Sequence, residues 1–326
     1  MVKNNYKTCF EKLDTYSMGS TRSGFGDGLY EASIKNKNVV VLSADLKDSL
    51  KVTKFENKFP NRFFEMGICE QNMMSAAAGM CINNKIPFVT SYAVFNPGRN
   101  WDQLRVSVCL SNHNVKILGG HAGLITGFDG ATHQALEDIA ITRVLPNLTV
   151  VVPCDEIEAK LATIEISKYV GPCYLRVSRD KSLNIYDENY KFEIGKASVL
   201  DEGDDVTIIA CGMMVQFAVE ASHCLREEGI KSTVINLSTI KPLVEKTILK
   251  YAKKTKAIVC VEEHQVMGGM GSCVSEFLSG SFPVPIEFLG VNDTFGESGN
   301  GYELLEKYGL STKGIIEKVK KVISRK

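Results

Sequence analysis

The chain has 326 residues, of which 38 are basic and 38 acidic, so its formal net charge is zero. This length predicts two domains rather than one. Because the charge is balanced and no dense basic run occurs, nucleic acid and anionic membranes are not expected as partners.

Apolar runs alternate with helical patterns along the chain, which is typical of an α/β fold built on mainly parallel sheets flanked by helices. In the first half, the predicted strands are 38–46, 86–95, 114–120 and 148–155. A helix is predicted over 155–170, with an acidic first turn suited to its N-terminus. Ligands collect at the carboxyl ends of parallel strands, so we expect the functional site there.

A polar, weakly periodic stretch at 183–193 predicts a linker between domains spanning 15–182 and 194–326. A second α/β unit follows it. The predicted strands of this unit are 205–212, 231–237 and 257–263, and the predicted helices are 215–229 and 243–255.

The N-terminus is polar and lacks the apolar region of a signal peptide. No stretch approaches the roughly 20 apolar residues that span a bilayer. The ten cysteines include no C-x-x-C pair, and several lie in apolar segments. These features predict a cytoplasmic protein with reduced cysteines and without a zinc site.

A single carboxylate, Glu70, lies within a nearly apolar segment, RFFEMGICEQNMMSAAAGM, at 62–80. The small and apolar residues after Asn72 predict a helix packed on most sides. A carboxyl at the start of such a helix has two interpretations. It is either solvated at the helix terminus, where negative charge is favoured, or buried, where its pKa rises and it can donate a hydrogen bond.

The segment HAGLITGFDGATHQALED at 121–138 places His121, Asp129 and His133 in a glycine-rich loop after a predicted strand. Such a loop suits proton handling or polar-substrate binding. The alternative is structural: His133 caps the next helix and His121 ends a strand. Arg22 and Arg179 suit phosphate binding, although single arginines more often form ordinary ion pairs.

The segments RFFEMGICEQNM, HAGLITGFDGATHQ, RVLPNLTVVVPCD and YLRVSR occur in the order and spacing found in transketolases. The chain is therefore identified as resembling their pyrimidine-binding and C-terminal domains, from about Thr21 onward. A complete transketolase begins with a pyrophosphate-binding domain of comparable size, and we do not expect such a domain before Tyr16 in this sequence. The resemblance thus implies a split enzyme, in which a pair of these chains joins two N-terminal partner subunits as a heterotetramer.

The resemblance also implies the cofactor, thiamine diphosphate, and the residues that bind it. Glu70 would hydrogen-bond a ring nitrogen of the aminopyrimidine and act catalytically, while Tyr92 and Phe95 would form aromatic walls around that ring. Asp45 would reach the cofactor across the subunit interface. Ligands of Mg²⁺ are expected on the partner. Gly26–Gly28 with Asn57 imitates the magnesium-diphosphate motif, but it continues into a predicted helix instead of following a strand.

For the substrate, the resemblance implies transfer of a two-carbon ketol unit between sugar phosphates, as in the pentose phosphate pathway. His121 and His133 would act catalytically in the substrate channel. The implied substrate-binding residues are Arg22, Ser49, His121, Asp129, His133 and Arg179. Three alternatives stay open: the β subunit of a 2-oxoacid dehydrogenase, a deoxyxylulose-phosphate-synthase-like half, and a non-catalytic remnant.

Overall fold

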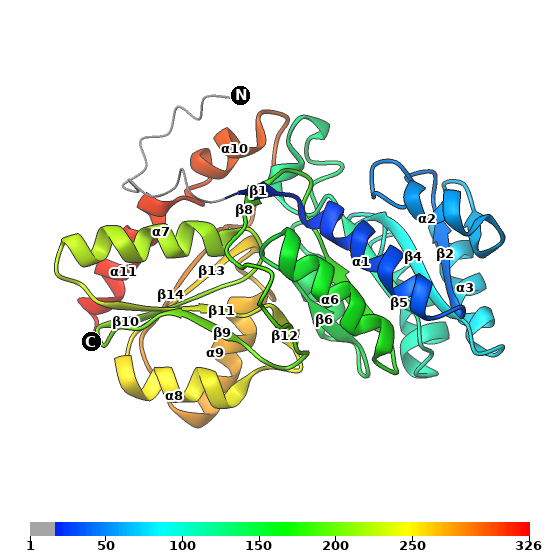
Figure 1. Cartoon of the computed structure of the whole chain (residues 1–326). Coiled ribbons are helices and arrows are strands. Elements are labelled where there is room, and N and C mark those ends of the chain that lie inside the picture. Colours follow the sequence, from blue (N-terminus) through cyan, green and yellow to red (C-terminus); the bar gives the residue numbers. More distant parts are fainter. Residues whose placement is uncertain (1–16) are drawn as a thin grey trace.

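The computed structural model describes residues 17–326, so the predicted domain start at residue 15 lies outside it. Within that range two mainly parallel sheets lie side by side, each flanked by helices (Figure 1). The predicted fold class is confirmed. None of the described helices combines the length and the apolar character that crossing a bilayer requires.

The first sheet has seven strands in the order β12-β6-β7-β5-β4-β2-β3 among the described residues. All pairs are parallel except β12 with β6. The strands are β2 (Val39–Ser43), β3 (Phe63–Glu65), β4 (Ile86–Tyr92), β5 (Lys116–Gly120), β6 (Thr149–Val151), β7 (Cys173–Arg176) and β12 (Thr239–Lys241).

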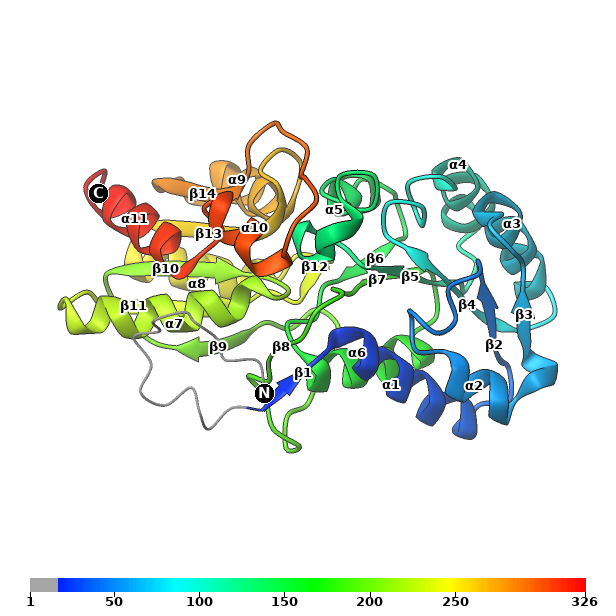
Figure 2. The ribbon, with the colours of Figure 1, turned by 90° about the horizontal axis from the view of Figure 1, so that it is seen from above.

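Helices cover both faces of this sheet, with α1 and α6 on one side and α3 and α4 on the other (Figure 2). The α-helices are α1 (Thr21–Lys35), α2 (Thr53–Lys58), α3 (Glu70–Cys81), α4 (Trp101–Gln103), α5 (Asp138–Arg143) and α6 (Glu156–Lys168). Two 3₁₀ turns, η2 (Pro60–Arg62) and η4 (Leu124–Asp129), and a π-helical segment, η3 (Leu104–Leu110), complete this half.

The second sheet has the order β14-β13-β10-β11-β9, with only β9 antiparallel within the described chain. Its strands are β9 (Ser198–Asp201), β10 (Val206–Ala210), β11 (Ser232–Asn236), β13 (Ile258–Gln265) and β14 (Ile286–Val291). The helices are α7 (Met214–Glu227), α8 (Glu245–Thr255), α9 (Met270–Ser281), α10 (Gly301–Lys307) and α11 (Thr312–Ile323). A small antiparallel pair joins β1 (Met18–Gly19) to β8 (Ser182–Leu183).

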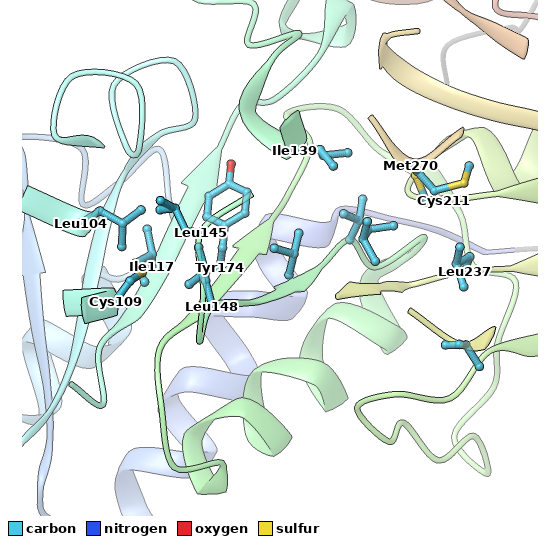
Figure 3. Packing of buried hydrophobic residues seen from close by; sticks show 14 of the residues in the cluster. Leu104, Cys109, Ile117, Ile139, Leu145, Leu148, Tyr174, Cys211, Leu237 and Met270 are labelled. Atoms are coloured by element: carbon cyan, nitrogen blue, oxygen red, sulfur yellow. The ribbon is translucent and has the colours of Figure 1, made fainter. Parts of the chain in front are cut away.

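The hydrophobic core follows from the alternation of side chains along the strands. In β2, Val39 and Val41 pack toward α1 and α6, whereas Val40 and Leu42 face α3. The cluster that contains Val40 and Leu42 continues into the other half of the chain, where it includes Leu237 (Figure 3). One apolar core therefore spans both sheets.

Strand β12 comes from the second half of the sequence but extends the first sheet, pairing Thr239 with Val151. The predicted linker is also held in place. The Asp155 carboxylate caps α6 by accepting from the Glu158 N–H at 2.7 Å, and its other oxygen accepts from the Ile185 and Tyr186 N–H groups. The two halves are thus joined by a strand and by a shared helix cap.

Helix α3 begins at Glu70, within the segment where a helix was predicted. The expectation that it is packed on most sides is wrong for this chain taken singly. Met73 and Met74 are buried, but Gln71, Asn72 and Gly79 are exposed. Sequence composition does not distinguish burial within one chain from burial against a second chain.

Two glycines of the segment GFGDGLY, residues 24–30, serve helix packing. Gly24 and Gly28 of α1 lie against α6, where a Cβ on Gly24 would lie 2.0 Å from the Glu156 carbonyl oxygen. Gly24→Ala should therefore lower the free energy of unfolding by about 1–3 kcal/mol. The matched control is Gly79→Ala, because that glycine has open space around its Cβ position. In chemical denaturation the control should be neutral or stabilising, and equal effects of both variants would contradict this packing role.

Candidate active site

The predicted site residues gather at the carboxyl ends of neighbouring parallel strands. Tyr92 ends β4 and is paired in register with Gly120, the last residue of β5. His121 follows directly, and Phe95 lies in the turn after Tyr92, where its N–H donates to the Tyr92 carbonyl. The parallel register therefore brings residues about thirty positions apart in sequence to one edge of the sheet.

Four rings form a compact aromatic and imidazole cluster there. The Tyr92 and Phe95 rings are nearly parallel at 19°, with centroids 6.4 Å apart. Tyr92 contacts the His121 ring at 4.0 Å, and the His133 ring meets Phe95 edge-on at 5.4 Å. Since α5 begins only at Asp138, His133 is not the cap of that helix. The cluster joins both histidines of the glycine-rich loop to the predicted aromatic walls.

Glu70 is 1% exposed, and both of its carboxylate oxygens accept hydrogen bonds. Ser91 Oγ lies 3.0 Å from Oε1, and Arg99 Nη1 lies 2.7 Å from Oε2. The amide of Asn100 also donates to the Glu70 backbone carbonyl. The structure therefore confirms that this carboxyl is buried, but in the described residues both of its oxygens accept hydrogen bonds and neither donates one.

His121 is almost fully buried and has a left-handed backbone, with φ of 52°. Burial, together with the positive charges of Arg22 and Arg179, lowers the pKa of His121 to about 3. Its ring is therefore neutral at physiological pH. The buried Nδ1 atom has no hydrogen-bond partner among residues 17–326, so it is free to bind a ligand group.

Two guanidinium groups lie beside this histidine. Arg22 donates to the Ser49 carbonyl at 3.0 Å, and Arg179 donates to the Thr126 carbonyl at 2.6 Å and pairs with Asp129 at 3.3 Å. Burial and the neighbouring positive charge of Arg179 lower the pKa of Arg22. Two positive charges that both act on His121 favour the binding of an anion beside it.

Asp45 is the site residue least connected to this group. It lies exposed beyond β2 in a left-handed conformation, and its N–H donates to the Glu65 carboxylate at 2.8 Å. The contacts found in residues 17–326 therefore join Asp45 to the β3 strand end rather than to the aromatic cluster. For Ser49, it is the backbone carbonyl and not the hydroxyl that meets Arg22.

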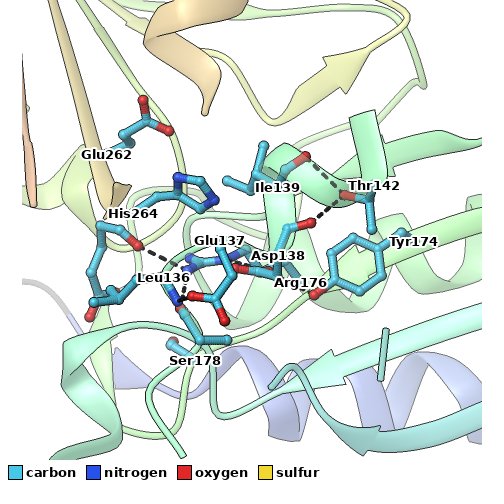
Figure 4. A network of polar contacts seen from close by, with 12 residues as sticks. Leu136, Glu137, Asp138, Ile139, Thr142, Tyr174, Arg176, Ser178, Glu262 and His264 are labelled. Carbon is cyan, nitrogen blue, oxygen red and sulfur yellow. Dashed lines mark hydrogen bonds and ion pairs between the residues drawn. The ribbon is translucent and has the colours of Figure 1, made fainter. Parts of the chain in front are cut away.

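A buried polar network that links β7 of the first sheet to β13 of the second supports the loop that carries His121 and Asp129. Arg176 donates to Asp138 at 2.8 Å and to the Glu263 carbonyl at 2.9 Å, and Tyr174 donates to the same carboxylate (Figure 4). The Glu263 side chain accepts from the Ile125 N–H at 2.6 Å. Glu263 thus fixes the glycine-rich loop from the opposite domain.

Sequence reasoning missed Glu263, Ser91 and Arg99. The acidic pair at the end of a predicted strand gave a signal for Glu263, since charged residues there seldom serve only the core. For Arg99 the signal was its spacing of four residues from Phe95, which places both on one face of a helical turn.

The buried Glu263 predicts a pH dependence of stability. Burial raises its pKa to about 7, against the effect of Arg176, from an ordinary value of 4.5. The folded state therefore binds this proton more tightly than the unfolded state, and the wild type loses stability as pH rises through that interval. Relative to wild type, Glu263→Gln should gain up to about 3 kcal/mol between about pH 5 and about pH 8.

Thermal melts of both proteins across this pH range would measure the difference. The exposed Glu306→Gln on α10 is the control, and its difference from wild type should not change with pH. If the Glu263→Gln difference is equally flat, preferential protonation of Glu263 in the folded state is wrong.

Comparison with known proteins shows which family the sequence and the fold resemble. Residues 17–183 match the family model of the transketolase pyrimidine binding domain, and residues 195–315 match that of the transketolase C-terminal domain. The chain is 42% identical to a putative transketolase C-terminal section of Methanocaldococcus jannaschii, over 91% of this chain and 94% of the relative. It is 37% identical to a subunit of the apulose-4-phosphate transketolase of Phocaeicola vulgatus, over 92% of this chain and 96% of the relative.

A solved structure of similar fold is a split-gene transketolase described as an inactive β4 tetramer. It has a TM-score of 0.88 and 43% identity, with 94% of this chain and 98% of that chain covered. The two family models together match most of the sequence, and the relatives match it almost throughout. The chain therefore belongs to the transketolase family.

Proposed function

We propose that this chain is one subunit of a two-chain transketolase that transfers a two-carbon ketol unit from a ketose phosphate to an aldose phosphate. The observation that carries the proposal is the buried Glu70 carboxylate beside the Tyr92 and Phe95 rings at the strand ends. The names of near full-length relatives, one a transketolase subunit and one a C-terminal section, support the two-chain form. We keep the division into 15–182, a linker at 183–193, and 194–326 as part of this proposal.

The residues present fit the aminopyrimidine half of thiamine diphosphate. A buried carboxylate that already binds a flat, N–H-bearing guanidinium can bind a flat aminopyrimidine edge, and aromatic faces suit its ring. Glu70 would hold a proton at a ring nitrogen, while Tyr92 and Phe95 would orient the ring. Asp45 would contribute from across the subunit interface. When bound, the cofactor supplies the electron sink for carbon–carbon bond cleavage.

The residues around His121 fit a sugar phosphate. The neutral His121 and the neighbouring His133 would move protons at substrate hydroxyl and carbonyl oxygens, and Asp129 would accept a hydrogen bond from a sugar hydroxyl. Arg22 and Arg179 would bind the phosphate, with Ser49 beside them. The relative that acts on apulose 4-phosphate by name supports a phosphorylated sugar without restricting it to the pentose phosphate pathway.

The partner is proposed to be the N-terminal, pyrophosphate-binding subunit, which would supply the ligands of Mg²⁺. The exposed face of α3 supports contact with a second chain. The related β4 tetramer, described as inactive, supports self-association of such chains without turnover. We propose a heterotetramer containing two copies of this chain. The cysteines in residues 17–326 form no disulfide with one another, which supports a cytoplasmic location.

The test is reconstitution. The purified chain alone should show no ketol transfer and should bind thiamine diphosphate weakly in calorimetry with Mg²⁺. Adding the N-terminal partner should restore both binding and transfer, because the diphosphate contacts would come from that subunit. Tight, magnesium-dependent binding with full turnover by this chain alone would contradict the proposal.

A further inference from the structure

The Arg99 side chain lies against the same two groups to which the proposed function assigns the aminopyrimidine. The backbone N–H of Arg99 donates to the Phe95 carbonyl at 2.9 Å, so one helical turn separates the two residues. The guanidinium carbon lies 4.4 Å from the centre of the Phe95 ring, and Nη1 lies 2.7 Å from Glu70 Oε2. Arg99 therefore covers an aromatic face and binds the buried carboxylate at once.

A guanidinium and an aminopyrimidine share the features that these groups recognise. Both are flat and delocalised, carry N–H donors in the ring or fork plane, and stack on aromatic faces. Glu70 Oε1 already accepts from Ser91, so Oε2 is the oxygen that Arg99 occupies. A ligand that stacks on the Phe95 face covered by Arg99 and bonds Oε2 competes with the guanidinium for both groups.

The two partners of this ion pair differ in their access to water. The Arg99 side chain is 42% exposed, whereas that of Glu70 is 1% exposed. Release of Arg99 into solvent leaves a hydrated cation, at little cost. If Arg99 leaves, Glu70 keeps the Ser91 hydrogen bond on Oε1 but loses the donor on Oε2 and the only positive charge that pairs with it among the described residues. A buried carboxylate that loses its counter-charge is costly, so Oε2 then requires another donor.

We propose that Arg99 is a displaceable placeholder for the aminopyrimidine, holding the Glu70 carboxylate until thiamine diphosphate exchanges for it. This inference rests on the proposed function and adds a residue that regulates cofactor entry. In this arrangement Arg99 weakens cofactor binding, because its contacts with Glu70 and Phe95 must be broken first. Before the cofactor binds, Arg99 compensates the buried charge of Glu70.

Arg99→Ala provides the test, in the full chain combined with its N-terminal partner. Calorimetry with thiamine diphosphate and Mg²⁺ should show roughly fivefold tighter binding than wild type, the factor equivalent to one partly exposed ion pair. The melting temperature of the variant chain should be lower than that of wild type before cofactor is added, and the difference should vanish in the saturated complex. If the alanine variant does not fold, Arg99→Gln is the second variant for the same measurements.

The matched control is Arg226→Ala, because Arg226 is also about half exposed, at 49%, and pairs with a less exposed carboxylate, Asp201, at 2.6 Å. This variant should not alter cofactor affinity. Weaker binding by Arg99→Ala would make Arg99 a cofactor ligand and overturn the proposal. Unchanged affinity with an equal stability loss before and after saturation would make it structural and also overturn the proposal. If the wild-type complex itself takes up no thiamine diphosphate, the proposed function fails instead.

Discussion

Glu70→Gln should lower the turnover of ketol transfer at least about a hundredfold at saturating cofactor, within the range of positioned acid–base groups. Glutamine has nearly the same shape, and its amide oxygen can still accept from Ser91 or Arg99. It cannot exchange a proton with a ring nitrogen, which is the role proposed for Glu70. Steady-state assays of the reconstituted enzyme would measure the loss, and melting curves should show that the fold is kept.

Glu227→Gln is the control for this experiment. Glu227 is an exposed acid in the last turn of α7, on the second half of the chain. Its replacement should leave turnover close to wild type. Near-normal turnover by Glu70→Gln would refute the catalytic assignment.

Arg179→Ala should raise the Michaelis constant for phosphorylated sugars by about ten- to a hundredfold, the range for one charged hydrogen bond. The substitution leaves Arg22 as the remaining guanidinium beside His121, so the electrostatic attraction for the sugar phosphate falls. Activity on the corresponding free sugars should change far less, which makes them the internal control. Equal losses on both substrate classes would show that Arg179 serves only to hold Thr126 and Asp129.

Much of the fold could be predicted because local patterns determine it. The strand ending before Ala44, the helix capped by Asp155 and the helix starting at Glu70 all follow from apolar periodicity and capping chemistry. The position of Thr239–Lys241 could not be predicted, because three residues carry no information about which sheet they will join. The exposure of one face of α3 could not be predicted either, because composition does not distinguish burial within one chain from burial against a second chain.

The site was predicted through the resemblance more than through the residues themselves. Each histidine and arginine had an ordinary structural interpretation when taken alone, and only parallel strand register brings them together. The Arg99–Glu70 pair could not be predicted, because residues 29 positions apart become neighbours through the packing of α3 against β4. Glu263 lies 138 residues from the amide that it binds.

Strand β12 has a consequence for how the chain can be divided. The open side of β6 would present unpaired backbone groups, a surface that recruits other strands and leads to aggregation. In the intact chain Thr239–Lys241 covers that edge, although it follows β9, β10 and β11 of the other sheet in sequence. A fragment ending near residue 183 would lose this cover along with the Leu237 and Met270 side chains of the shared core. The two matched family segments are therefore units of sequence, whereas the first sheet and the shared core are completed only by residues of the second segment.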